Sequence, residues 1–194
     1  AKGQFTFGDY SYTIEYEYID PTGVPIAITG YSGPGGAVTI PDVLAGHPVE
    51  KIQHAFEGCL TLTSVRTPDS GFFRTIGDAV FAGCSNLTNV VLSGPVAGFG
   101  EGAFYGCARL TNIELGASSI GAEAFARSGL RNVAIGRYTT QIGAGAFSDC
   151  ADLTAITVAS NNASFFSANG VLFDRFVEIT QSGWTDRIGL FQYP

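Results

Sequence analysis

The stretch from Ile142 to Val158, IGAGAFSDCADLTAITV, carries an apolar skeleton that recurs four more times upstream in this 194-residue chain. Aligning the copies places one phenylalanine at each of five equivalent positions, Phe56, Phe81, Phe104, Phe125 and Phe147. The intervals between them are 25, 23, 21 and 22 residues. A period of about 20 to 29 residues is typical of a leucine-rich solenoid, in which each repeat buries its apolar edges against its neighbours.

Other apolar positions follow each phenylalanine at fixed spacing. A cysteine comes three residues later in four of the copies, at Cys59, Cys84, Cys107 and Cys150, whereas the fourth copy has Ser128 there. A leucine and then a β-branched residue complete each unit. The pattern predicts an α/β repeat solenoid, a right-handed leucine-rich-repeat-like coil with a parallel β-sheet face. We expect the five phenylalanines to point inward as a spine, with the AF-x-x-C segments forming short helical or 3₁₀ turns.

The chain divides into three parts. Residues 1–36 alternate apolar and polar side chains between turn residues, which predicts an N-terminal β cap over the first coil. Residues 37–158 hold the leucine-rich repeats, as one half-copy, AVTIP, and five full units. Residues 159–194 form C-terminal strands that are either a cap around Trp184 or the start of further repeats. The loop holding Phe72 and Phe73 either covers the core edge, which we favour, or forms an apolar patch.

The segment after each cysteine should form a strand paired in parallel with its counterpart in the next coil, about 4.8 Å away. In the second unit, Val90 and Leu92 would point inward. The alternate residues would then face solvent in two columns, which are Ser64, Asn89, Asn112, Asn132 and Ala155, and Arg66, Val91, Glu114, Ala134 and Thr157. Sequence variation that encodes recognition is confined to such outward positions and loops. The candidate binding residues are therefore Arg66, Asn89, Asn112, Glu114 and Asn132.

Composition excludes several classes of function. Only 14% of residues are charged and the net charge is −7, so the clustered cations that nucleic-acid binding requires are missing. No apolar run approaches the 18 to 20 residues of a transmembrane helix. The sequence opens AKGQF and contains no Met, which fits a mature or trimmed exported chain. A cytosolic fragment cloned without its start is the alternative.

The cysteines and histidines do not form a reactive constellation. An even number of cysteines in a secreted protein is normally interpreted as disulfides, but these four occupy one repeated position, which favours free, reduced, buried thiols. They contain no CxxC pair and are spread along the axis, so no metal site is expected. His47 and His54 are interpreted as solvated corner residues, because no nucleophile elbow or HExxH spacing accompanies them. We expect no catalytic residue and no cofactor. The glycosylation acceptor pattern at Asn86 and Asn162 is interpreted as a chance match.

Several motifs together resemble the BspA-like leucine-rich repeat proteins of bacterial surfaces. They are the consensus I-G-x-x-A-F-x-x-C-x-x-L-x-x-I-x-L, the shortened AFxxSGL variant, the lead-in ITGYSGPGGAVTIP, and the tail NGVLF followed by QYP. The resemblance covers roughly residues 26 to 175 and the last few residues. It implies a scaffold with an extracellular or cell-surface location, whereas the ligands of the family vary.

Two functions remain open from the sequence. The first is a non-enzymatic surface or secreted module that binds a protein or glycan partner on its sheet face. The second is a structural spacer within a larger surface protein. An outward column without Tyr, Trp or an Arg cluster favours the spacer slightly, because interface hot spots are usually aromatic or Arg. An enzyme with a site assembled across coils is the least favoured alternative.

Overall fold

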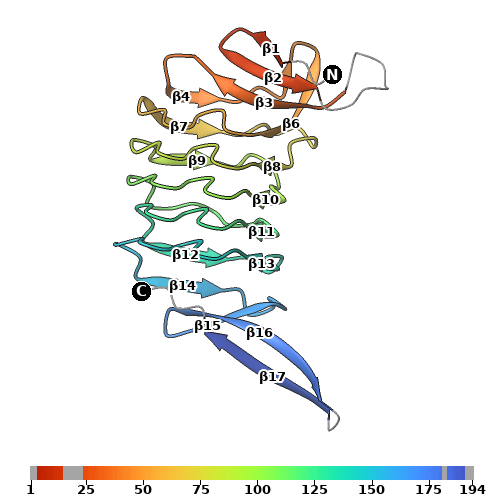
Figure 1. Ribbon diagram of the computed structural model, residues 1–194, viewed down its shortest axis with the longest axis vertical. Helices are drawn as coiled ribbons and strands as arrows, with labels where there is room; N and C mark the ends of the chain where they lie inside the picture. Colours follow the sequence, from red (N-terminus) through yellow and green to blue (C-terminus); the bar gives the residue numbers. More distant parts are fainter. Residues whose placement is uncertain (1–3, 15–23, 181–182, 191–194) are drawn as a thin grey trace.

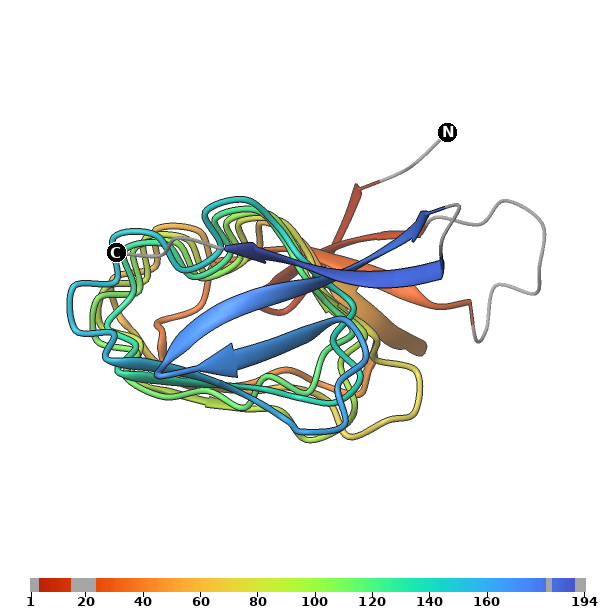
Figure 2. The same cartoon turned by 90° about the horizontal axis from the view of Figure 1, so that it is seen from below.

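The computed structural model describes residues 4–14, 24–180 and 183–190 of the chain, with side chains placed up to residue 174. These residues form a β-solenoid whose coils stack along the long axis (Figure 1). Viewed along that axis, successive coils superimpose closely (Figure 2). The strands before the first repeat phenylalanine are β1 (Gln4–Phe7), β2 (Tyr10–Ile14), β3 (Ile26–Tyr31), β4 (Gly36–Thr39), β5 (Val43–Leu44) and β6 (His47–Ile52).

The repeats contribute β7 (Leu62–Arg66), β8 (Thr75–Ile76), β9 (Asn89–Val91), β10 (Gly98–Phe99), β11 (Ser119–Ile120), β12 (Asn132–Ile135), β13 (Gln141–Ile142) and β14 (Ala155–Val158). At the C-terminal end lie β15 (Phe165–Ala168), β16 (Val171–Thr180) and β17 (Gly183–Leu190). We call β4, β7, β9, β12 and β14 the wall strands, and β6, β8, β10, β11 and β13 the corner strands. All pairs that the structure forms within either set are parallel.

The predicted phenylalanine spine is confirmed. All five rings are at most 1% exposed. Neighbouring rings along the axis lie 5.1 to 5.7 Å apart between centroids, with interplanar angles of 5° to 25°. Rings stacked at this spacing bury a large apolar area and add a favourable quadrupole contact. The spine therefore dominates the packing energy of the coil.

The predicted helical turns are wrong, and so is the α/β class, because the described residues contain no helix of any kind. Each spine phenylalanine is flanked two residues before and two residues after by a left-handed residue, for example Ala79 (φ 48°) and Gly83 (φ 73°) around Phe81. Left-handed residues break a right-handed helix. The backbone bonds are divided between local turns and the next coil. Phe81 N–H donates to Ala103 O in the next coil at 2.8 Å, whereas Cys84 N–H donates to Phe81 O within the segment at 3.0 Å. The two kinds of bond together satisfy peptide groups that a helix would satisfy within itself.

Glycine at the corner lets the coils approach closely. A Cβ on Gly121 would lie 2.5 Å from the carbonyl carbon of Gly100, and one on Gly143 would lie 2.4 Å from the backbone nitrogen of Ala122. Neither contact is possible for a real side chain. The repeated glycine after the corner strand is therefore a requirement of coil stacking.

The N-terminal strands extend the corner sheet. Strands β1 and β2 form an antiparallel hairpin around Gly8, which has a positive φ of 58°. Strand β2 pairs antiparallel with β3, and β3 runs parallel to β6. Residues 15–23 of the predicted N-terminal β cap lie outside the described residues. Among these strands Phe5 and Phe7 are exposed.

The C-terminal end of the coil is covered by the β15–β16 hairpin. The N–H of Ile156 donates to Gly170 O at 2.9 Å, and the N–H of Val158 donates to Ser167 Oγ at 3.1 Å. Phe165 and Leu172 from this hairpin are buried in the core. The side chain of Trp184, which belongs to the segment predicted to be either a cap or the start of further repeats, lies outside the described residues.

Candidate functional site

The outward columns predicted from the sequence exist on either side of one interruption. Pairing places Ser64 opposite Asn89 and Arg66 opposite Val91. Further along the axis it places Asn132 opposite Ala155 and Ala134 opposite Thr157. Between these two sets, the wall sheet β4-β7-β9 ends at β9, and the next wall sheet begins at β12.

The segment 111–115 of the third unit lies at this interruption and forms no strand. It contacts the following coil through a parallel bridge from Leu115 to Ile135 and a 3.3 Å bond from Arg131 N to Thr111 O. No backbone hydrogen bond links residues 89–91 to residues 112–114 in the part of the chain that the structure describes. The wall therefore opens between the second and third units.

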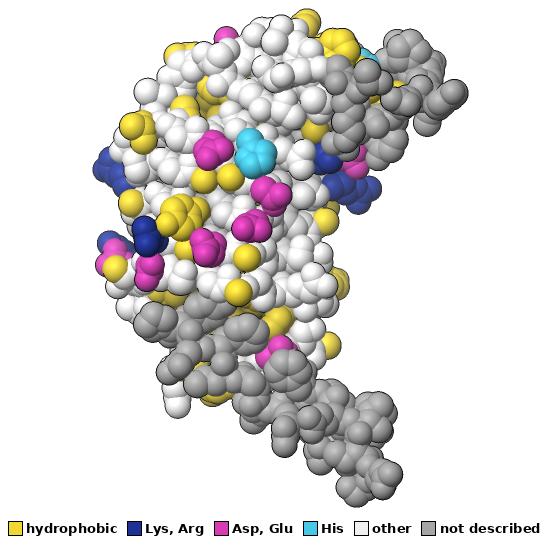
Figure 3. All heavy atoms as spheres, viewed as in Figure 1, with side chains coloured by type: hydrophobic (Ala, Val, Ile, Leu, Met, Phe, Trp, Pro, Cys, Tyr) yellow, Lys and Arg dark blue, Asp and Glu magenta, His cyan; other side chains and the backbone are white. Residues whose placement is uncertain are grey.

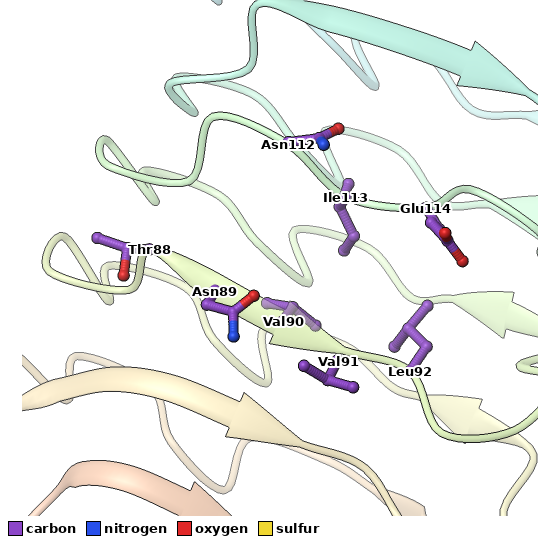
Figure 4. Close-up of a pocket in the computed structure, with 8 residues that line it drawn as sticks. All are labelled: Thr88, Asn89, Val90, Val91, Leu92, Asn112, Ile113 and Glu114. Carbon is purple, nitrogen blue, oxygen red and sulfur yellow. The ribbon is translucent and has the colours of Figure 1, made fainter.

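The opening is a groove of about 320 Å³. Figure 4 shows Asn89, Val90 and Leu92 on one side and Asn112, Ile113 and Glu114 on the other. A second hollow of about 170 Å³ between β14 and the β15–β16 hairpin has no charged side chain in its lining. The first groove is thus the better candidate for recognition.

Three of the five candidate residues meet at this groove. Asn89, Asn112 and Glu114 are all exposed and line it. Asn89 Nδ2 donates to Ser64 Oγ at 3.4 Å. The other two candidates lie outside the groove, where Arg66 donates from Nη1 to Ser93 Oγ at 3.3 Å and Asn132 Oδ1 accepts from Thr154 Oγ1 at 3.2 Å.

The groove itself was not predicted. Val90 and Leu92, which the sequence assigns to the inside, are only partly buried, whereas the equivalent Val65 and Val133 are 0% and 2% exposed. The signal in the sequence is a short connection. The inward wall residue and the corner residue are 7 positions apart in the third unit, from Ile113 to Ile120, but 9 positions apart in the second and fourth units. We attribute the absence of a strand at 111–115 to this shorter perimeter.

A second feature that the sequence reasoning missed is the pair Arg137 and Tyr138. The guanidinium carbon of Arg137 lies 4.4 Å from the centroid of the Tyr138 ring, which is 62% exposed. Both residues lie in the turn after β12, separated from the strand by Gly136. An exposed Arg and Tyr are the residue types enriched at interface hot spots, and they stand in a loop and not in an outward column.

The acidic balance of the sequence shows on the surface. In Figure 3 acidic side chains occupy the middle of the face seen there, and Lys and Arg lie toward its margins. Arg127 is held by Asp149 at 3.2 Å, and this bond, with the nearby Tyr105, raises the pKa of the guanidinium. In the described residues, no three His, Cys, Asp or Glu side chains stand close enough to hold a metal ion.

All four cysteines are free, and three of them are buried as predicted. Cys84, Cys107 and Cys150 donate their thiols to the carbonyl of the spine phenylalanine one coil earlier, at 3.0 to 3.2 Å. Burial raises the pKa of the Cys84 thiol to about 12 and raises that of Cys107 as well. Cys59 corrects the prediction, because it lies at the start of this ladder and is partly exposed.

The two histidines differ in their exposure to solvent. His54 is solvated as expected, with Nδ1 3.6 Å from a Glu57 oxygen. His47 contradicts the expectation, because it is buried and its Nδ1 lies 3.1 Å from Val24 O. Its backbone pairs with Leu44 in the antiparallel ladder of β5 and β6.

The two phenylalanines of the apolar loop also differ in their exposure to solvent. Phe73 is buried in the core, whereas Phe72 is exposed. Backbone bonds from Asp69 and Ser70 to the Asp42 carboxylate hold the loop in place.

The glycosylation pattern at Asn162 has a structural role. Its Nδ2 donates to Gly136 O and Thr139 O at 2.7 and 2.9 Å, and its Oδ1 accepts from two backbone N–H groups at 2.7 Å. The side chain is 3% exposed. An amide with every hydrogen-bonding group occupied and buried is not an acceptor surface for a sugar.

Comparison with known proteins agrees with this architecture. The model of the BspA type leucine rich repeat region matches residues 50–169 in six copies. A leucine-rich repeat protein of T. pallidum is 33% identical, with a TM-score of 0.62 over 68% of this chain. A leucine-rich cell surface protein of Faecalibacterium prausnitzii is 25% identical, with a TM-score of 0.52 over 100% of this chain.

The pneumococcal vaccine antigen PcpA shares the fold at 18% identity, with a TM-score of 0.61 over 89% of this chain. The chain spans 63%, 62% and 54% of the length of these three solved proteins. Comparison with curated protein sequences gives no significant match. Within the described residues there is no helix of the length and apolarity that a membrane crossing requires.

Proposed function

Because this chain belongs to the BspA-type leucine-rich repeat family, we propose that it is a non-enzymatic module of a bacterial surface or secreted protein. It binds a protein or glycan partner through the outward face of its wall strands. One observation carries the proposal: inward wall residues are fixed by packing, whereas the alternating outward residues are exposed or partly exposed and most of them are polar. In β12, for example, Val133 is buried between the exposed Asn132 and Ala134.

The same comparison supports an extracellular location. A neighbour in structure is described as a cell surface protein of Faecalibacterium prausnitzii. The buried thiols of Cys84 and Cys107 are compatible with export, because a thiol without solvent access and with a raised pKa is unreactive toward oxidants. The outward face then meets host or neighbouring-cell molecules directly.

A binding screen with the whole chain tests the proposal. Pull-downs and a glycan array identify the partner, and binding is then compared with a variant carrying alanine at Arg66, Asn89, Asn112, Glu114 and Asn132. The matched control replaces exposed residues of similar chemistry elsewhere, Glu101, Arg109 and Gln141. We expect the first variant to lose binding and the control to keep it. Equal binding by both variants would place the site on the Arg137–Tyr138 loop, the Phe72 loop or the capping strands.

A structural spacer is the second candidate. It is favoured by the outward columns themselves, which contain no aromatic residue and one arginine, Arg66. A spacer predicts that the whole chain captures no partner in either screen.

A further inference from the structure

The groove between β9 and residues 111–115 uncovers part of the apolar core. At the position of Val90 the other wall strands place Val65, Val133 and Ile156, which are 0%, 2% and 3% exposed. Val90 and Leu92 are partly exposed because no strand closes over them. The floor of the groove is therefore aliphatic surface, and the equivalent surface in the other wall strands is buried.

The rim of the groove is polar and carries one charge. Glu114 is exposed, and in the described part of the chain its carboxylate has no hydrogen bond or ion pair. The same holds for the side-chain amide of Asn112. Figure 4 shows the Glu114 carboxylate opposite the Leu92 side chain. No lysine or arginine lines the groove.

We propose that this groove receives a lysine or arginine side chain from a partner protein. The aliphatic stem of the cationic side chain packs on Val90 and Leu92, and its charged head reaches Glu114 and the amide oxygen of Asn112. Long basic side chains bury their methylene stems while the charge stays at a polar rim. This inference rests on the proposed binding function and names the chemistry of the partner.

Other occupants fit less well. A glycan site commonly stacks a sugar ring on an aromatic side chain, and the groove lining contains none. Anions are repelled by Glu114. An added β-strand is excluded because residues 111–115 already stand beyond the edge of β9. The net charge of −7 also favours encounter with a basic partner.

A peptide titration of the whole chain, followed by backbone amide NMR, tests the inference. The probe is the capped peptide Ser-Gly-Lys-Gly-Ser, and the comparison peptide carries uncharged norleucine in place of lysine. We expect saturable shifts confined to residues 89–92 and 112–114 with the lysine peptide. The norleucine peptide should bind about fivefold more weakly or not at all, since it retains the apolar stem without the charge.

Two variants separate the site from general charge attraction. Glu114→Gln should weaken the lysine peptide about fivefold, whereas Glu101→Gln, which removes the same charge from an exposed turn residue, should leave the affinity unchanged. The inference is overturned by an absence of shifts in the groove, by equal binding of the norleucine peptide, or by equal losses in the two variants. Both variants are checked for an unchanged unfolding midpoint.

The outcome is distinguishable from failure of the proposed function. If a partner found in the screens loses binding to the five-residue alanine variant but the lysine peptide does not bind, the sheet face is the site and the cationic occupant is wrong. A partner that is a neutral glycan would likewise contradict the cationic occupant. If the lysine peptide binds but an identified partner binds the alanine variant as tightly as the parent, the sheet face as partner site is wrong.

Discussion

The two sheet-forming sides of this solenoid repeat the same sequence units, but only one of them is continuous. The corner strands pair without a break from β6 through β8, β10 and β11 to β13, beside the stacked phenylalanines. The wall strands stop pairing at β9 and resume at β12. The difference shows that stacking of the coils requires continuous packing at the corner but tolerates a break in the pairing of the wall strands.

Stacking requires the phenylalanine that all five units share and the corner glycine that four of them share, whereas the first unit has Gln53 at the glycine position. A missing ring in the spine or a Cβ on Gly121 would disturb two neighbouring coils at once. The wall depends instead on the length of the connection to the corner, which varies between units. A solenoid can therefore keep its core and still open one side into a groove.

Thiol accessibility gives the largest expected contrast. Cys107 is fully buried beside the spine, so it should react with an alkylating reagent only after unfolding, about 10³-fold or more slowly than partly exposed Cys59. Mass spectrometry of native and then denatured protein measures both sites. Comparable native rates at the two cysteines would mean that the corner side opens readily.

Removing one ring tests the spine. Phe104→Ala should lower the free energy of unfolding by about 3 to 5 kcal/mol, because the ring is buried between Phe81 and Phe125. The matched control is Phe72→Ala, where the ring is exposed, and we expect a change within about 0.5 kcal/mol. Denaturant unfolding compares the two. Similar losses would contradict the central place of the spine.

A single methyl group tests the close approach of the coils. Gly121→Ala should cost about 1 to 3 kcal/mol, because the new Cβ would meet the backbone of Gly100. Gly116→Ala meets no atom within 4 Å and has no positive φ, so it should be neutral or stabilise by up to about 1 kcal/mol. Thermal unfolding of both variants decides, and a neutral Gly121→Ala would show that the coils can separate slightly at no cost.

Amide hydrogen exchange compares the two parts of the wall. Residues 112–114 have no backbone partner in β9, so their amides should exchange about tenfold faster than those of β12, which pairs with β14. Protection equal to that of β12 would mean that the groove closes in solution.

The smallest expected effect is on the outward face. Asn112→Ala and Arg66→Ala should each change the free energy of unfolding by no more than about 0.5 kcal/mol, because both side chains are exposed. A loss above about 1 kcal/mol on chemical denaturation would assign these residues to stability and weaken their role in recognition.

The sequence by itself determined the features that repeat. The period, the inward spine, the parallel register of Ser64 with Asn89, and the corner glycines all follow from residues found at the same place in successive units. Each of these depends on contacts between one coil and the next identical coil. A residue that is repeated in successive units therefore indicates directly which residues of neighbouring coils are in contact.

Tertiary structure alone decided the backbone hydrogen-bond partners and the features that depend on segments outside the repeat pattern. Hydrogen bonds between coils, together with local turns, replaced the expected helical turns, and the Phe104 N–H, for example, donates to Ala124 O in the next coil and not within its own segment. The burial of His47 depends on Val24, 23 residues earlier. The groove depends on the short connection from Ile113 to Ile120, in the unit whose residues 111–115 form no strand. The repeat pattern does not show which carbonyl a turn N–H meets, and the burial of His47 and the groove are set by segments that differ from the repeat.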